Sequence, residues 1–378
     1  MLGILELGYK LLVNDRPKFF ALLVGITFAV FLMIEMTSLF SGAMYRASST
    51  VTNIGAKMWV MDPAVQAVAN TIPLPDYVLD EVRSAAGVKF AVPLYSGGAL
   101  VKLRDGTYQS VTVVGLDDES LFGRPELIEG DIENIFAENG FIVVKDAEFD
   151  KLENPAIGAE FELNEHLGRI VGIAHVATSG LFGVPTLYTT FNRAREYIPN
   201  SRFTISYVLV EPKSPTDAAG IKRQVAAMGY VALTQEEFDQ RISTFYIYQT
   251  GFGINLLLMT AISFIVGLSI SGQTYYTFIL ENLDKFGALK AIGAKGYELV
   301  AMILFQAVFV ALTGLGLGIG ACALMIWLAK LYLPSYAAMM TYGGLGLAFG
   351  MVMVIAGISG YAGIRKVLRI DPFDIFRG

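Results

Sequence analysis

The sequence predicts a membrane protein with four transmembrane α-helices and a large α+β extracytoplasmic domain inserted between helices 1 and 2. Two observations support this. Hydrophobic residues make up 54% of the 378 residues and charged residues only 16%, a balance outside that of ordinary soluble domains. Four nearly uncharged runs are also longer than the roughly 20 apolar residues that a membrane-spanning helix needs. Residues of ordinary mixed composition separate the first run from the second.

The N-terminal segment, residues 1–18, predicts an amphipathic helix on the cytoplasmic membrane surface. Its apolar residues recur at helical spacing, and Glu6 and Lys10 form an i,i+4 pair before Pro17. A simple extension of the first span is the alternative. Residues 19–42 predict transmembrane helix 1, which we expect to be retained because no small-residue cleavage site follows it.

Residues 43–248 predict the extracytoplasmic domain with its stalk. Strand patterns occur at residues 57–61, 89–93, 99–103, 110–115, 140–144, 160–163, 169–174 and 206–211, and helical patterns at 76–86 and 216–228. This mixture with short connections favours an α+β domain. We expect two lobes, with a boundary in the glycine- and proline-containing stretch 177–186. Residues 235–248 show no obvious break before the second span, which predicts a continuous helical stalk.

The remaining chain alternates spans with short connections. We predict transmembrane helices at residues 249–280, 299–329 and 342–364, a cytoplasmic loop at 281–298, a short outer loop at 330–341 and a cytoplasmic tail at 365–378. Basic residues gather in the segments assigned to one side: Lys10, Arg16, Lys18, Lys285, Lys290, Lys295, Arg365, Lys366, Arg369 and Arg377. By the positive-inside rule, both termini and the 281–298 loop should be cytoplasmic.

Composition and motifs argue against several functions. Residues 41–248 contain 17 Lys and Arg against 26 Asp and Glu, so the domain offers no electrostatic footprint for nucleic acid. Cys322 is the single cysteine and lies within a span, so we expect no disulfide in the domain. His166 and His175 stand alone, without a nucleophile and carboxylate pattern. We therefore predict neither catalytic residues nor a metal site, and interpret both histidines as structural or surface residues.

Glycine runs in the spans do not predict a phosphate-binding loop. No GxxxxGK[ST] pattern occurs, and a phosphate within these apolar runs would be unsolvated. We interpret their small residues as sites of close helix packing, with substrate passage as the alternative. The residues concerned are Gly314, Gly316, Gly318, Gly320, Gly346 and Gly350.

Glu35 is the ionisable residue inside a predicted span, and such residues are costly enough to suggest a function. By its helical rise from Phe19, it should lie near the outer membrane boundary. Snorkelling or pairing there is one interpretation. The other is an entry site for an amphiphilic substrate, lined by Glu35, Met36, Tyr45, Phe245 and Tyr246.

The 281–298 loop resembles the segment joining the second and third spans of FtsX/MacB-type ABC permeases. The matching residues are KFGALKAIGA, and the ALKAIG wording is similar to the DevC branch. The tail RKVLRIDPFDIFRG, with Asp371 and Pro372, resembles the family's closing motif, and residues 140–174 resemble its MacB-like outer core domain. Lys285 departs from the family pattern, which commonly has Glu there, and this puts a specific salt bridge to a partner in doubt.

The resemblance implies a permease homodimer in the bacterial inner membrane that works with a separate cytoplasmic ABC ATPase. ATP and Mg would bind to that partner, so we expect this chain to carry no cofactor and to be no enzyme itself. The loop residues would receive the motion of the ATPase and pass it outward by mechanotransmission. These coupling residues are Lys285, Phe286, Gly287, Ala288, Leu289, Lys290, Ala291, Ile292 and Gly293. We expect a short helix there, delimited by Gly287 and Gly293.

Three functions are compatible with this resemblance. The first is export or extrusion of a hydrophobic or amphiphilic substrate, which in related Gram-negative systems also uses a membrane-fusion adaptor and an outer-membrane channel. The second is an FtsX-like signalling module that regulates an extracytoplasmic partner, and the third is haem or porphyrin export. The size of the outer domain favours transport over signalling, and the sequence leaves the substrate open.

Overall fold

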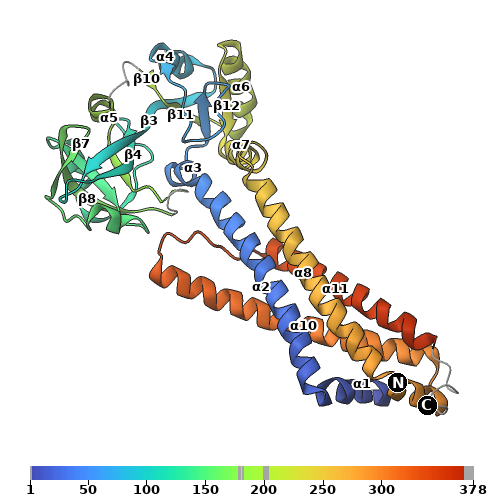
Figure 1. Ribbon diagram of the computed structural model, residues 1–378. Helices are drawn as coiled ribbons and strands as arrows, with labels where there is room; N and C mark the ends of the chain where they lie inside the picture. The colour runs from blue at the N-terminus through green and yellow to red at the C-terminus, as the bar shows by residue number, and fades with distance from the viewer. Residues whose placement is uncertain (1, 178–179, 181–182, 199–203, 370–378) are drawn as a thin grey trace. The chain divides into compact units, whose positions relative to one another are not determined.

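A computed structural model describes residues 2–177, 180, 183–198 and 204–369. The chain divides into two compact units (Figure 1). The membrane unit comprises residues 1–42 and 253–378, and the outer unit runs from Ala43 to Phe252. A large domain of strands and helices is thus inserted between the first and second long helices, as the sequence predicts.

Four helices among the described residues are long and apolar enough to cross a membrane: α2 (Arg16–Ala47), α8 (Phe252–Glu281), α10 (Gly296–Tyr332) and α11 (Tyr342–Leu368). Helix α1 (Leu2–Asn14) precedes α2 and is separated from it at Asp15. The short helix α9 (Leu283–Ala291) lies between α8 and α10. The predicted tail motif at Asp371 and Pro372 lies outside the described residues.

The membrane unit packs around one apolar cluster to which all six helices contribute. Leu12 of α1, Ile26 of α2 and Phe278 of α8 belong to it. Phe286 of α9, Met302 of α10 and Val352 of α11 complete the set. The remaining faces of the long helices expose apolar side chains such as Leu257 and Trp327, which suits contact with lipid.

The outer unit is built on a ten-stranded sheet whose first part is antiparallel. Its order is β12 (Val231–Thr234), β1 (Met58–Met61), β11 (Tyr207–Pro212) and β3 (Val88–Lys102). Alternate residues of β1 pack on opposite faces, Met58 and Val60 in one apolar cluster and Trp59 and Met61 in another, as a strand's two-residue period requires. Helices α4 (Tyr77–Ser84) and α6 (Ala218–Ala227) cover the first face, and α3 (Ser49–Ile54) and α7 (Gln235–Tyr248) the second.

The second part of the sheet closes on itself as a small barrel. From β3 the order continues through β4 (Tyr108–Leu116), β9 (Thr186–Thr190), β6 (Gly140–Val144) and β8 (His166–His175). Strand β7 (Glu160–Leu163) pairs with both β8 and β3, which completes a ring of six strands. The remaining elements are β5 (Glu126–Gly130), which extends the sheet from β8, the pair β2 (Leu74–Pro75) and β10 (Thr204–Ile205), α5 (Phe191–Tyr197), and the 3-10 turns Ile132–Phe136, Phe149–Leu152 and Pro215–Asp217.

Two predictions about this unit are wrong. The stretch 177–186, whose residues 178–179 and 181–182 are not described, joins β8 to β9 within the barrel and is therefore not a lobe boundary. Strand β3 is shared by the antiparallel part and the barrel instead. The stalk is also not continuous, because α7 ends at Tyr248 and α8 begins at Phe252. Gly251 between them has a φ of +74°, a left-handed conformation that interrupts a helix.

Candidate functional site

The short helix α9 forms with the help of polar groups at both of its ends. Asn282 is buried, donates its side-chain amide to the carbonyl of Phe278 (2.8 Å) and accepts from Lys285 Nζ (2.7 Å). After the helix, Gly293 takes a φ of +108°, which few other residues tolerate. The Glu298 carboxylate then accepts from the Lys295 backbone amide (2.9 Å) at the start of α10.

Helix α9 has an inner and an outer face. Phe286 is fully buried in the core of the membrane unit, Gly287 is buried, and Leu289 packs at the edge of the same core. Gly287 therefore lies inside the helix and does not delimit it, which corrects the prediction. The outer face carries exposed side chains, and Ile292, the residue directly after the helix, is 86% exposed. The other predicted coupling residues on exposed positions are Lys285, Ala288, Ala291 and Gly293, and Lys290 is half-buried.

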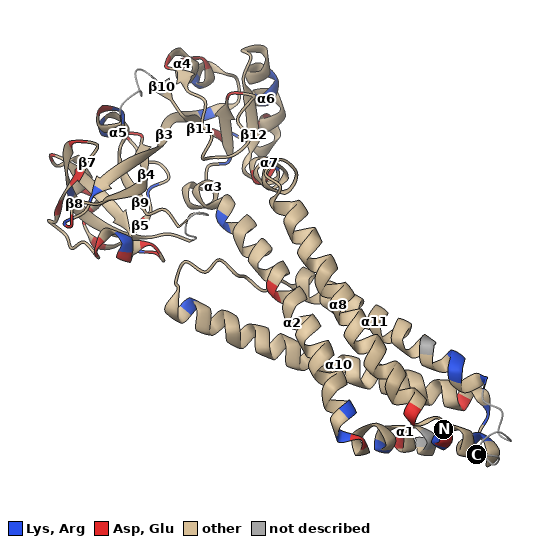
Figure 2. Cartoon of the chain, viewed as in Figure 1, with Lys and Arg blue, Asp and Glu red and all other residues tan. Residues whose placement is uncertain are grey.

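Polar contacts tie the neighbourhood of α9 to the rest of the membrane unit. Lys290 Nζ donates to the carbonyl of Leu368 at the end of α11 (3.2 Å). Lys18 near the start of α2 forms ion pairs with Asp15 (3.0 Å) and with Glu281 at the end of α8. Charged residues gather at the end of the unit where α1 lies and are sparse along the long helices (Figure 2). The helix is thus anchored in the unit at several points.

Glu35 is buried between α2 and the connection from α10 to α11. Its side chain is 5% exposed and accepts hydrogen bonds from the Tyr336 hydroxyl and from Cys322 Sγ (3.4 Å). The Met339 amide also donates to the Ser38 carbonyl (2.9 Å), so this connection lies along α2. Burial with two hydrogen-bond donors satisfies a carboxyl group that would otherwise be costly at this depth. No local sequence signal pairs Tyr336 with Glu35, because the two residues are 301 positions apart.

The predicted substrate-lining residues are divided between the two units. Glu35 and half-buried Met36 belong to the membrane unit, whereas Tyr45, Phe245 and Tyr246 belong to the outer unit. The rings of Phe245 and Tyr246 meet edge to face at 5.3 Å. Burial raises the pKa of Tyr246, and Tyr45 is 45% exposed. An entry site formed by all five residues stays a prediction.

Two of the six predicted packing glycines lie where two helices approach closely. A Cβ on Gly314 would lie 2.6 Å from Ile26 Cγ2, and one on Gly318 would lie 2.5 Å from Val30 Cγ1, so both positions let α10 approach α2 closely. Within the described chain, nothing lies within 4 Å of a Cβ built on the other four, and their role in helix packing stays a prediction: Gly316, Gly320, Gly346 and Gly350. Gly314 and Gly316 are two residues apart and face different sides of a helix.

The two histidines lie at the ends of β8. His166 stacks on Tyr197, with ring centroids 4.8 Å apart, and both histidines are exposed. No group of three His, Cys, Asp or Glu suited to hold a metal ion occurs among the residues that the structure describes. The arrangements around them accordingly give no basis for assigning chemistry to either.

Comparison with known proteins assigns the chain to a family. Residues 19–228 match the MacB-like periplasmic core domain, and residues 251–372 match the FtsX-like permease C-terminal region. An uncharacterized ABC transporter permease of Mycobacterium tuberculosis is 26% identical over 370 residues, which cover 94% of this chain and 93% of that protein. The macrolide export ATP-binding/permease protein MacB of Salmonella typhimurium is 22% identical over 203 residues, covering 50% of this chain and 31% of that protein.

Among solved structures, the periplasmic region of MacB from Actinobacillus actinomycetemcomitans is similar with a TM-score of 0.38 and 11% sequence identity, covering 50% of this chain and 92% of that one. The first family model spans more than half of the chain, and the second spans most of the remainder. Both agree in order and position with the outer unit and with the helices that follow it. The chain therefore belongs to the MacB/FtsX-type family of ABC transporter permeases.

Proposed function

We propose that this chain couples ATP hydrolysis by a separate ABC ATPase to the export or extrusion of a hydrophobic or amphiphilic substrate. The observation that carries the proposal is the geometry of α9. Phe286 anchors the helix in the membrane unit, while Ile292 at its other end is 86% exposed. An exposed apolar side chain beside charged residues suits an anchor at a protein contact, where a partner would cover it and the charges would form the rim.

Ile292 and Tyr297 would form the apolar part of the ATPase-docking surface. Tyr297, in the first turn of α10, is 59% exposed. Lys295 lies above its ring, with the ammonium nitrogen 6.0 Å from the ring centroid. Because buried aromatic and aliphatic anchors within a polar rim contribute most of the affinity of interfaces, this small patch suits docking on a cytoplasmic partner.

Motion received at α9 would pass into the long helices. The helix is joined to α8 through Asn282 and to α10 through residues 292–295, and Phe286 packs in the same core as Phe278 and Met302. A packed core transmits displacement because it cannot be compressed appreciably. In this proposal ATP and Mg bind to the ATPase, and the permease works as a dimer in the inner membrane with both termini cytoplasmic.

The experiment is purification of the full chain in detergent, with mass spectrometry of the proteins that accompany it. We expect an ABC ATPase to copurify, and Ile292→Asp to reduce its recovery about tenfold or more, because a charge would be buried in the interface. Ile128→Asp is the matched control, since Ile128 is also exposed but lies on β5 of the outer unit.

Two outcomes would contradict the proposal. One is recovery of the wild-type chain without any ATPase, and the other is an unchanged ATPase recovery with Ile292→Asp. If the ATPase copurifies but the reconstituted complex extracts no lipid or other amphiphile from the membrane, the signalling function gains support over transport.

A further inference from the structure

Helix α2 carries Arg46 in its last turn, within the outer unit. The helix runs unbroken from Arg16 to Ala47, and residues from Ala43 onward belong to that unit. The other connection between the units is interrupted between Tyr248 and Phe252. Since rigid secondary elements carry coupling better than segments with free torsions, a displacement of α2 should reach Arg46 with little loss.

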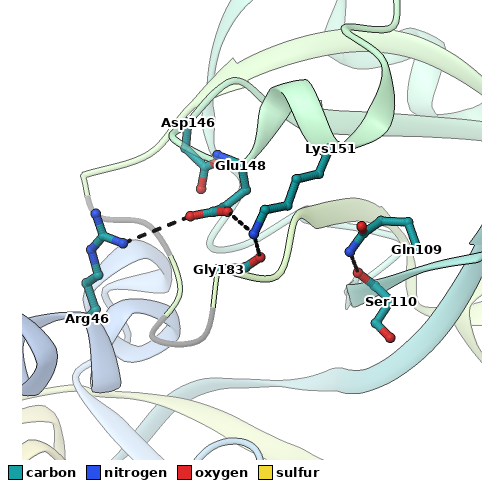
Figure 3. Close-up of polar contacts among 7 residues, drawn as sticks. All are labelled: Arg46, Gln109, Ser110, Asp146, Glu148, Lys151 and Gly183. Carbon is teal, nitrogen blue, oxygen red and sulfur yellow. Dashed lines mark hydrogen bonds and ion pairs between the residues drawn. The ribbon is translucent and has the colours of Figure 1, made fainter. Parts of the chain in front are cut away.

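Arg46 lies beside a buried carboxylate of the barrel. Glu148 has a fully buried side chain, with Oε1 4.0 Å from Arg46 Nη1 and Oε2 2.6 Å from Lys151 Nζ. Lys151 in turn donates to the carbonyl of Gly183 (2.6 Å), and the four residues form one connected group, which we call the Arg46 clasp (Figure 3). Arg46 itself is 13% exposed. Charges so shielded from water interact more strongly than exposed ones.

The Arg46 clasp fits its surroundings closely. Gly183 has a φ of +63°, and a Cβ there would lie 2.8 Å from Lys151 Nζ and 3.0 Å from Glu148 Oε2. The Glu148 amide donates to the Asp146 carboxylate (3.0 Å), which fixes the turn. A larger residue than glycine at position 183 would therefore push the ion pair apart.

The clasp reaches two neighbouring strands of the barrel. Glu148 follows the end of β6, and Gly183 precedes the start of β9. These strands are paired, with Val143 opposite Leu187, and β6 also pairs with β8. A displacement that arrives at Glu148 thus acts on strands in the ring itself.

We propose that Arg46 and Glu148 are positioning residues that deliver a displacement of α2 to the barrel. The inference rests on the proposed function, because it needs an ATPase that drives the displacement. Neither residue is assigned a contact with substrate. The alternative is that the two residues only stabilise the turn after β6. In that case, removal of the Arg46 charge should by itself raise hydrogen exchange in the absence of nucleotide.

The test uses the full complex with its copurifying ATPase in lipid nanodiscs. Hydrogen–deuterium exchange is followed in peptides covering residues 140–152 and 183–190, without nucleotide and after trapping with ATP and vanadate. In the wild type we expect trapping to change exchange in these peptides about twofold or more. Arg46→Gln should abolish that change while the ATPase rate stays within about twofold of wild type, because the ATPase and its docking surface are untouched.

Three variants serve as controls. Arg46→Lys keeps the charge and should retain part of the nucleotide-dependent change. Lys102→Gln breaks the Lys102–Glu162 ion pair (3.2 Å), which joins β3 to β7 and includes no residue of α2, and it should retain all of the change. Arg46→Gln combined with Glu148→Gln removes both charges, so it should lose the change even if the single variant folds poorly.

The inference is overturned if Arg46→Gln keeps the nucleotide-dependent change, or if the trapped wild-type complex shows none. It is also overturned if Arg46→Gln and the double variant, measured without nucleotide, both raise exchange in these peptides to the level of the vanadate-trapped wild type. The Arg46 clasp would then only stabilise the turn. The absence of a copurifying ATPase would instead reject the proposed function, and this inference with it.

Discussion

The two connections between the membrane unit and the outer unit are built differently. The first is helix α2, which is unbroken and ends at a buried ionic contact with the barrel. The second is broken at residues 249–251, and α7 on its outer side is held by apolar packing of Phe238 and Ile242 against Trp59 and its neighbours. Under the proposed function, the first connection would transmit displacement and the second would permit it. Three substitutions sharpen this comparison.

The largest effect is expected from Phe238→Ala. Phe238 is fully buried, and its ring lies 5.6 Å from that of Trp59. Truncation of a buried phenylalanine costs about 3–5 kcal/mol of unfolding free energy. We expect a clearly lower melting temperature of the full chain in detergent, followed by tryptophan fluorescence. Tyr248→Ala, at a position 75% exposed on the same helix, is the control and should change little. Equal melting temperatures for the two variants would show that α7 is not held by this packing.

A smaller effect is expected from Gly251→Ala at the break. The glycine has a φ of +74° with nothing near its Cα that a methyl group would meet. The alanine should therefore lower the free energy of unfolding only by the cost of its left-handed backbone, about 1–2 kcal/mol. Gly220 in α6 also has no neighbour that a methyl group would meet, but it lies in a helix. Gly220→Ala should therefore raise the free energy of unfolding by up to about 1 kcal/mol. If both variants shift the melting temperature in the same direction, the break does not depend on this backbone conformation.

The smallest effect concerns Asp239, which links α7 to Ser48 beside the end of α2. Burial raises the pKa of Asp239 above its ordinary value of 3.8. The hydrogen bond from Ser48 lowers this pKa, and the negative charge of Glu236 raises it further. Because the folded state then binds the proton more tightly than the unfolded state, stability falls as pH rises through the folded pKa. Asp239→Asn should therefore raise the melting temperature at pH 7.

The same variant should lose its advantage as the pH falls through the folded pKa toward 3.8, because Asp239 becomes protonated in the folded state and a charge is then no longer buried. Melting curves of the two proteins between pH 4 and pH 7 measure this. A difference that is constant over the range would mean that the effect is not electrostatic, and the link between α7 and Ser48 would need another explanation.

Much of the fold could be predicted because its strongest signals are local. The four long helices follow from uncharged runs, and strands such as β1 and β6 follow from short apolar runs. Closure of the barrel could not be predicted, since it depends on β7 pairing with both β3 and β8, which are far apart in sequence. The five-residue strand β9 was missed as well, because Thr186–Thr190 lies in the middle of the barrel and gains its stability from neighbours.

The short helix α9 was predicted in position, but which of its side chains are buried was not. The charged loop and Gly293 indicated a short helix between two spans. Phe286 and Ile292 are both large and apolar, so composition alone could not tell which is buried and which is exposed. Arg46 and Glu148 were not singled out, because charged residues about 100 positions apart give no local signal.

The burial of Cys322 has a practical consequence for experiments on this protein. The chain has one cysteine, its side chain is fully buried, and its sulfur donates a hydrogen bond to Glu35. A thiol so shielded reacts slowly with maleimide reagents. Cysteines introduced at exposed sites can thus be labelled selectively in the otherwise native sequence, and probes can be attached to either unit without first replacing a residue that helps to hold Glu35.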